Sequence, residues 1–472
     1  MMTSPNLESN ERDYKLSRAL HLAAVAALGG FLFGFDTAVI NGAVNAMRAE
    51  FDIGAVLTGF VVSSALLACV VGAYIAGRMA ERTGRIRVML LASVLFTISA
   101  LGSGFASGPA DMIVWRMIGG LGVGAASVIA PAYIAEISPA SIRGRLGSLQ
   151  QLAIVFGIFI ALLSDYFLSS VAGGSANELW GSVAWRWMFW VEVIPALAYG
   201  VLALTIPESP RYLVSRNEIQ RARAVLRSVM TRGVDDRIKE IQRTARREAR
   251  SSIRDLLGKN NRVLPIVWIG IALSIFQQFV GINVIFYYSS TLWQAVGFTE
   301  ADALTQTVIT SVTNIVVTLI AIALIDKIGR KLLLTIGSAG MFISLGVMAW
   351  VFAIADRTMI DGELVPVLTD TQGPIALIAA NGFVVFFGMS WGPGVWVLLG
   401  EMFNNKIRAT ALGVAAAVQW LANFAVSTTF PKMADISLGF AYGFYTLFAF
   451  LSLVFVIKWV PETKGRELED MD

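Results

Sequence analysis

In the middle of the chain the sequence reads Phe276-Gln277-Gln278-Phe279-Val280-Gly281-Ile282-Asn283-Val284-Ile285-Phe286-Tyr287-Tyr288. This segment lies inside an apolar run from about Val263 to Trp293, which is long enough to cross a lipid bilayer. It nevertheless carries three carboxamides and two phenols, and a polar group in hydrocarbon costs free energy unless another group bonds it. Such side chains therefore normally face a cavity or a neighbouring helix.

Gln278 and Asn283 would point about 140° apart on a regular helix with about 3.6 residues per turn. Gly281, which lies between them, allows the helix to bend or unwind and so to bring the two amides together. Amides donate and accept hydrogen bonds, as sugar hydroxyls do, and aromatic rings cover the apolar face of a sugar. Two interpretations are open: a sugar-binding site, or hydrogen bonds that only hold neighbouring helices together.

Composition places the chain among polytopic membrane proteins rather than soluble enzymes, because 56% of its 472 residues are hydrophobic and only 15% are charged. The single cysteine, Cys69, excludes an internal disulfide and a cysteine-based metal cage. The single histidine, His21, leaves little material for a zinc site or a histidine-based triad. We therefore expect no metal and no cofactor. The net charge of +4 comes from the loops, so it indicates membrane topology and not nucleic-acid binding.

Apolar segments long enough to span a membrane recur along the whole chain, and we predict that each forms a transmembrane helix. The twelve segments are approximately 19–43, 55–77, 88–108, 111–136, 146–170, 185–206, 263–293, 303–325, 332–355, 373–401, 407–430 and 438–460.

Basic residues predict the orientation, since Lys and Arg are enriched in cytoplasmic loops. Most of the 37 Lys and Arg residues lie on one side of the predicted membrane, many of them in the long link 207–262. We therefore expect a multi-pass protein of the cell (inner) membrane with both termini in the cytoplasm. Within the link, the stretch from Ile219 to Leu257 indicates short surface helices.

The link divides the chain into two halves that repeat one another, which indicates a duplicated six-helix unit. The expected domains are 1–206, a cytoplasmic linker 207–262, 263–460 and a short tail 461–472. Such halves, related by an axis along the membrane normal, are typical of transporters that rock about a site at the midplane. The matching pairs are Glu81-Arg82-Thr83-Gly84-Arg85 with Asp326-Lys327-Ile328-Gly329-Arg330, Glu136 and Arg143 with Glu401 and Arg408, and Pro207-Glu208-Ser209-Pro210-Arg211 with Pro461-Glu462-Thr463-Lys464-Gly465.

Further ordered motifs run through the chain from Gly29 to Glu467, namely Gly34-Phe35-Asp36-Thr37, Gly77 before Glu81-Arg82, Arg116-x-x-Gly119-Gly120-x-Gly122-x-Gly124, Pro131-x-Tyr133-x-x-Glu136, Arg143-Gly144 and Gln277-Gln278-x-x-Gly281-x-Asn283. Together with the repeats, they resemble the sugar porters of the major facilitator superfamily, and chiefly bacterial glucose permeases and the xylose–proton symporter. The resemblance implies an all-α membrane protein with twelve transmembrane helices in two pseudo-symmetric halves, acting as a monomer. One departure is Glu81, where the family usually has Asp.

The resemblance also implies a substrate site. Where that symporter has another glutamine, this chain has Ile158, so we expect a less polar wall that suits glucose better than xylose. For Trp391 and Trp420, helix packing is the alternative role. The substrate-binding residues that the resemblance implies are Phe33, Gln151, Gln277, Gln278, Asn283, Tyr288, Asn314, Trp391, Gln419 and Trp420.

Two charges lie within predicted membrane helices of opposite direction and at a similar depth, Asp36 and Arg116. An isolated charge there is costly, so we expect the two to pair. Proton binding to Asp36 would release Arg116, which supplies a switch between protonation and helix rearrangement. The resemblance favours this switch over a static ion pair, because proton symporters of the family carry Asp at this position. Glu192 is a second buried carboxylate whose role is open.

Charged residues at the cytoplasmic ends of the helices are predicted to form a gate between the halves in the outward-facing state. The alternative is that they mainly fix topology, since an exposed ion pair contributes only about 0–1 kcal/mol. The predicted gate residues are Glu81, Arg85, Glu136, Arg143, Glu208, Arg211, Asp326, Arg330, Glu401, Arg408 and Glu462.

The sequence thus predicts a proton-coupled importer of monosaccharides, most specifically D-glucose, and not an enzyme. No nucleotide or phosphate-loop motif is present to suggest transport driven by ATP. The expected partners are the sugar, the proton and the lipid bilayer, with no nucleic acid. The alternatives are an uncoupled sugar facilitator, a symporter for another hexose, a pentose or inositol, a non-transporting sugar sensor and, more remotely, a drug exporter.

Overall fold

The computed structural model describes residues 15–138, 143–248, 253–257, 262–360, 363–403 and 407–462, with the side chains of 143–145, 244–248, 253–254, 325–327, 357–360, 363–366 and 408–409 left out. Within these residues, 12 helices are long and apolar enough to cross a membrane, as the sequence predicts. The first span is longer than the predicted 19–43 and reaches Glu50, because the helix continues through the polar residues Asn45, Arg48 and Glu50 after the apolar run ends.

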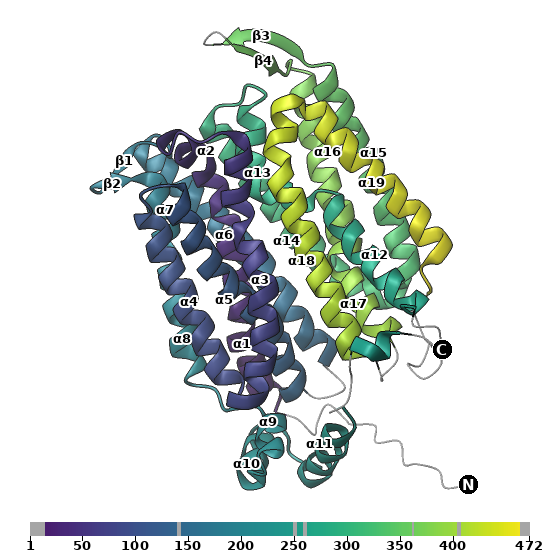
Figure 1. The fold of residues 1–472 in the computed structure, drawn as a ribbon. Coiled ribbons are helices and arrows are strands. Elements are labelled where there is room, and N and C mark those ends of the chain that lie inside the picture. Colours follow the sequence, from purple (N-terminus) through teal and green to yellow (C-terminus); the bar gives the residue numbers. More distant parts are fainter. Residues whose placement is uncertain are drawn as a thin grey trace.

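The first half of the chain folds into a bundle on one side of the molecule (Figure 1). Helices α1 and α2 together form the first span, and α7 and α8 together form the sixth. Its elements are α1 (Leu16–Ala38), α2 (Ile40–Glu50), α3 (Ala55–Thr83), α4 (Arg85–Phe105), α5 (Pro109–Ile137), α6 (Arg143–Ala172), the hairpin of β1 (Glu178–Leu179) and β2 (Ser182–Val183), α7 (Ala184–Val191) and α8 (Val193–Ala203).

The second half forms the other bundle, after a connection made of short helices. The connection consists of α9 (Pro210–Ser215), α10 (Ile219–Val229), α11 (Val234–Glu248) and the 3-10 turn η3 (Ile253–Leu256). The second bundle consists of α12 (Pro265–Phe279), α13 (Ile282–Gln294), α14 (Glu300–Ile328), α15 (Arg330–Ala353), the hairpin of β3 (Asp356–Ile360) and β4 (Glu363–Val367), α16 (Gln372–Phe386), the π-helical turn η4 (Phe387–Trp391), α17 (Gly392–Met402), α18 (Arg408–Ile436) and α19 (Leu438–Trp459).

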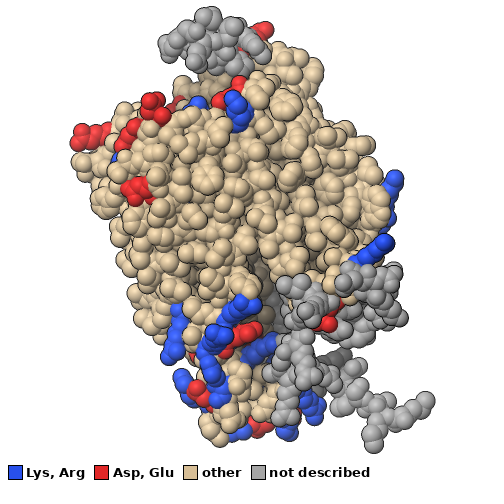
Figure 2. All heavy atoms as spheres, in the orientation of Figure 1, with Lys and Arg blue, Asp and Glu red and all other residues tan. Residues whose placement is uncertain are grey.

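The two ends of the molecule differ, and we name them by their elements. The end that carries α9, α10 and α11 is called the linker face, and the end that carries the two β-hairpins is called the hairpin face. Figure 2 shows Lys and Arg concentrated toward the linker face and mainly Asp and Glu at the hairpin face, with a broad uncharged surface between them. This distribution is that of a protein embedded in a bilayer between two aqueous phases.

The internal repeat is visible in the backbone. Gly84 separates α3 from α4 with φ +99°, and Gly329 separates α14 from α15 with φ +97°, a conformation that glycine adopts without steric cost. After each glycine a glutamate caps the new helix. The carboxylate of Glu208 accepts the N–H groups of Arg85 (2.9 Å) and Ile86 (3.2 Å). Glu462 accepts those of Arg330 and Lys331 (both 3.1 Å) in the same way.

Close packing inside the first half depends on the glycines of α5. A Cβ atom on Gly120 would overlap the carbonyl oxygen of Ala65, and one on Gly124 would overlap that of Cys69, both in α3. The spacing Gly120-x-x-x-Gly124 therefore forms a contact surface between helices, as is common in membranes, and not a binding loop. Between the two halves, α3 packs against α18 and α6 against α14.

Candidate functional site

The predicted break in the seventh span is present at Gly281, which has φ +85° and ψ +20° and ends α12 before α13 begins. The turn brings the amides on its two sides together, because Asn283 Nδ2 donates to Gln278 Oε1 at 2.5 Å. Gln278 Nε2 lies 3.5 Å from Gln277 Oε1. The prediction that Gly281 unites these side chains is therefore confirmed.

The amide cluster continues into the tenth span, where Gln277 Nε2 donates to the main-chain oxygen of Trp391 at 2.9 Å. Trp391 ends the π-helical turn η4, which the sequence analysis did not foresee. Turns of this kind interrupt regular helices and are frequent at functional sites. The indole itself is fully buried and donates to Ser338 Oγ (2.9 Å) and the Leu334 oxygen (3.2 Å) in α15, so its N–H group serves helix packing.

Other predicted substrate residues come from both halves of the chain. Phe33 of α1 meets Trp420 of α18 with ring centroids 5.3 Å apart, so this aromatic pair joins the halves. Neighbouring Gln419 is buried, and its Oε1 has no hydrogen-bond partner among the described residues. Asn314 of α14 is buried and lies beside Gly388 of η4. A Cβ atom on that glycine would be 3.2 Å from Asn314 Oδ1. An unpaired amide oxygen and a second buried amide are suited to bind a hydroxylated ligand.

Two of the predicted residues stand apart from this arrangement. Tyr288 is buried with its hydroxyl donating to the Ser427 oxygen at 2.8 Å, and its ring packs on Phe430, so its visible contacts join α13 to α18. Gln151 lies half-buried on α6. Its neighbour Gln150, which the sequence analysis did not select, is more deeply buried, and its Oε1 has no partner in the described part of the chain.

The predicted pairing of Asp36 with Arg116 is confirmed. Arg116 Nη1 lies 3.5 Å from Asp36 Oδ2 and donates a shorter bond, 2.8 Å, to the main-chain oxygen of Asp36. Both side chains are buried, with 2% and 1% exposed. Oδ2 accepts no hydrogen bond from the described residues, so the carboxylate is held mainly by charge and has an oxygen free to take up a proton.

Two further acids are buried near the same helices. Glu192 lies at the junction of α7 and α8, close enough for the charges of Asp36 and Arg116 to act on it, and neither of its carboxylate oxygens is bonded by a described residue. Asp165 of α6 accepts the Gly42 N–H at 3.2 Å. The sequence analysis did not single out Asp165, and the only signal for it is a lone acid inside an apolar span.

The predicted gate residues form two similar clusters at the linker face. Arg85 pairs with Glu136 (2.7 Å), whose other oxygen accepts Ser209 Oγ (2.5 Å), and Arg330 pairs with Glu401 (2.8 Å). Each of these ion pairs lies within one half. The remaining predicted members are distributed as follows: Glu208 and Glu462 cap helices, Arg211 lies in the first turn of α9, Glu81 is exposed, and the side chains of Arg143, Asp326 and Arg408 lie outside the described part.

At the hairpin face, hydrogen bonds join the halves directly. Asn41 of α2 donates to the Phe286 oxygen (2.8 Å) and to Ser289 Oγ (3.0 Å) of α13, and it accepts from Ser290 N at 3.2 Å. Glu300 of α14 accepts Ser169 Oγ (2.9 Å) and Ser175 N (2.8 Å) from the first half. These contacts hold the hairpin face closed in this conformation.

The chain is similar to known proteins along almost its whole length. A family model described as "Sugar (and other) transporter" matches residues 22–472. The glucose transport protein of Synechocystis sp. is 57% identical over 471 residues, which cover 99% of this chain and 100% of that protein. The D-xylose-proton symporter of Escherichia coli is 39% identical over 493 residues, covering 97% and 96% respectively. The solved xylose transporter of E. coli in a partially occluded inward open conformation has a TM-score of 0.82 at 38% identity and covers 96% of this chain and 100% of that one.

Proposed function

The chain belongs to the sugar transporter family of the major facilitator superfamily, and from this premise we propose that it imports a monosaccharide, most specifically D-glucose, together with protons. It is a transporter and not an enzyme. The related glucose transport protein supports glucose as the sugar, and the related D-xylose-proton symporter supports coupling to protons.

The proposal that sugar transport is coupled to protons rests on the buried pair of Asp36 and Arg116. An ionised Asp36 attracts Arg116, whereas a protonated one keeps only the hydrogen bond from Arg116 to its main-chain oxygen. Protonation thus loosens the contact between α1 and α5 without breaking it. The charges of Asp36 and Arg116 also act on Glu192. A proton bound by either acid would therefore change the net charge between the first, fourth and sixth spans.

The sugar site is proposed at the break of the seventh span. Gln277, Gln278, Asn283 and Asn314 would supply hydrogen bonds from the second half, and Gln419 would add its unpaired oxygen. The ring pair of Phe33 and Trp420 would cover the apolar face of the sugar, and Gln151 would approach from α6. Trp391 and Tyr288 would then act chiefly by positioning helices, since their polar groups are engaged in packing.

Transport would proceed by alternating access between the two faces. We propose that the linker face is cytoplasmic, with both termini there, and that the protein lies in the cell membrane and works as a monomer. Sugar and proton would enter while the hairpin face is open. Closure of that face by Asn41 and Glu300 would precede release at the linker face, where the ion-pair clusters of the two halves part.

Uptake of radiolabelled glucose into proteoliposomes tests the proposal. With an inward proton gradient, we expect accumulation above the external concentration, and a protonophore should abolish the accumulation but not the equilibration. Uptake that only equilibrates, with or without the protonophore, would identify an uncoupled facilitator. Absence of uptake for glucose and for other hexoses, pentoses and inositol would favour a sensor.

A further inference from the structure

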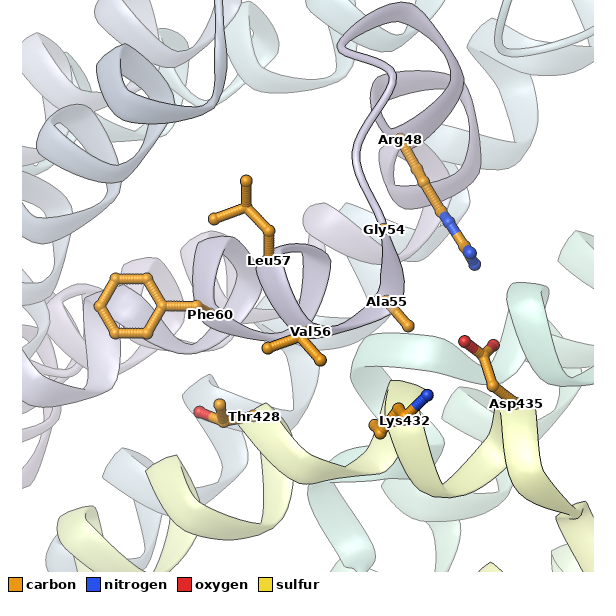
Figure 3. Close-up of a pocket in the computed structure, with 9 residues that line it drawn as sticks. All are labelled: Arg48, Gly54, Ala55, Val56, Leu57, Phe60, Thr428, Lys432 and Asp435. Atoms are coloured by element: carbon orange, nitrogen blue, oxygen red, sulfur yellow. The ribbon is translucent and has the colours of Figure 1, made fainter.

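A crevice of about 750 Å³ lies at the hairpin face, between α2 and α3 of the first half and α18 of the second (Figure 3). It is separate from the amide cluster, because its lining comes from the end of α2, the first turns of α3 and the last turns of α18. The crevice therefore has no part in the transport site proposed above.

One side of the crevice is charged. Figure 3 shows the Arg48 guanidinium, the Lys432 ammonium and the Asp435 carboxylate gathered there. Arg48 uses Nε to bond the Ile53 oxygen at 3.3 Å, which leaves its terminal nitrogens directed into the crevice. The side chains of Lys432 and Asp435, both exposed near the end of α18, form no hydrogen bond or ion pair with any residue that the structure describes. Two cations and one acid give the crevice a formal charge of +1.

The other side is apolar and lies on a helix that spans the membrane. Val56 has 63% of its surface exposed and Leu57 38%, and Phe60 follows one turn deeper in α3. A free sugar or a soluble ion would gain no binding free energy from contact with these apolar side chains. A ligand with an anionic head and a hydrocarbon chain matches both sides at once.

We propose that the crevice binds a phospholipid with a single negative charge and a hydroxylated headgroup, from the leaflet at the hairpin face. Its phosphate lies between Arg48 and Lys432, its headgroup hydroxyls donate to Asp435, and an acyl chain follows Val56, Leu57 and Phe60. The charge of −1 on phosphatidylglycerol complements the +1 of the crevice, whereas phosphatidylcholine brings no net charge.

The lipid links the two halves, since Arg48 belongs to the first and Lys432 to the second. Near the crevice, Ser63 of α3 and Thr428 of α18 share a hydrogen bond of 2.5 Å that belongs to the closed hairpin face. Arg48 and Lys432 lie together only while the halves meet here, so the bound lipid favours this conformation over one in which the hairpin face is open.

Native mass spectrometry of the full-length protein tests the site with phosphatidylglycerol and phosphatidylcholine of equal chain length. We expect preferential phosphatidylglycerol adducts, and we expect the Arg48→Gln/Lys432→Gln variant to bind it roughly tenfold more weakly. The matched control is Arg78→Gln/Lys458→Gln, which removes two exposed cations near the C-terminal ends of α3 and α19, away from the crevice, and should retain wild-type binding. Equal adducts for both lipids, or equal losses in both double variants, would overturn the proposal.

Two further measurements test whether the crevice binds the acyl chain as well as the phosphate group. Val56→Trp fills the apolar side and leaves every charge in place, so it should also reduce phosphatidylglycerol adducts, and unchanged adducts would contradict a lipid chain in the crevice. Soluble glycerophosphoglycerol should fail to displace the lipid, and displacement would indicate a site for the phosphate group alone. Thermal unfolding and glucose uptake show whether each variant is folded, and the binding readout stays valid whether or not uptake is proton-coupled.

Discussion

Arg116 Nη1 is 3.5 Å from the carboxylate of Asp36 but 2.8 Å from its main-chain oxygen, so the backbone bond is the closer of the two contacts. The Asp36→Asn variant therefore keeps the backbone bond and removes only the charge. We expect it to abolish accumulation of glucose against a gradient while counterflow exchange continues. Proteoliposome uptake with and without a protonophore measures the first, and exchange of labelled for unlabelled glucose measures the second.

The control for this variant is Asp370→Asn, which removes an exposed acid from the hairpin side of α16 and should leave accumulation intact. If Asp36→Asn still accumulates glucose and the protonophore still stops it, the proton is bound elsewhere, and Glu192 becomes the next group to replace.

The broken seventh span supplies a second prediction. In Gly281→Ala the alanine backbone must adopt φ near +85°, and its Cβ atom would lie 2.9 Å from the Tyr445 ring, so the substitution is strained in two ways. The conformation alone costs about 1–2 kcal/mol. We expect a lower unfolding temperature and weaker protection of the protein by glucose in thermal unfolding assays.

Gly443→Ala is the matched control, because a Cβ atom there meets nothing within 4 Å and α19 is regular. A Gly281→Ala protein as stable and as well protected by glucose as Gly443→Ala would show that the left-handed turn is dispensable.

The local sequence was sufficient to predict the break at Gly281 and the membrane spans. The π-helical turn and the burial of Gln150 could not be predicted, because they involve contacts between helices that are distant in the sequence. Gly281 between polar residues in an apolar run signals an interruption, and length with hydropathy signals a span. Trp391, which ends the π-helical turn, is bonded to α15 and α12, contacts that the local sequence of the tenth span does not show. The Gln150 amide occupies the space where a Cβ atom on Gly30 of α1 would lie. The sequence of α6 alone does not predict this contact with another helix.

Asn41 gives a prediction about conformation. Replacing it with Ala removes its side-chain bonds to Phe286, Ser289 and Ser290 across the two halves, while Ser289 Oγ keeps its bond to Thr307 Oγ1. Each lost bond contributes about 0.5–1.5 kcal/mol to the closed state, so the open hairpin face should gain population by about tenfold or more. Spin labels at the exposed residues Ser107 and Thr371, one in each half, measure the distance across this face.

The native Cys69 is buried and does not compete for the labels. Asn381→Ala serves as the control, because its amide bonds the Leu377 oxygen within α16 and crosses no interface between the halves. An unchanged distance distribution in Asn41→Ala would assign the closed hairpin face to other contacts, such as those of Glu300.

Gln278 and Tyr288 separate sugar binding from helix packing. Gln278 lies within the amide cluster, so Gln278→Ala should weaken glucose binding by about tenfold, near the upper range for one neutral hydrogen bond. It should also lower the unfolding temperature, because it removes the bonds to Asn283 and Gln277. Tyr288→Phe removes a bond to the Ser427 oxygen and should lower the unfolding temperature while glucose affinity in the folded protein stays near wild type. Binding by isothermal titration and unfolding by intrinsic fluorescence measure the two effects. The opposite pattern, with affinity lost in Tyr288→Phe and kept in Gln278→Ala, would move the sugar from the break in the seventh span toward α18.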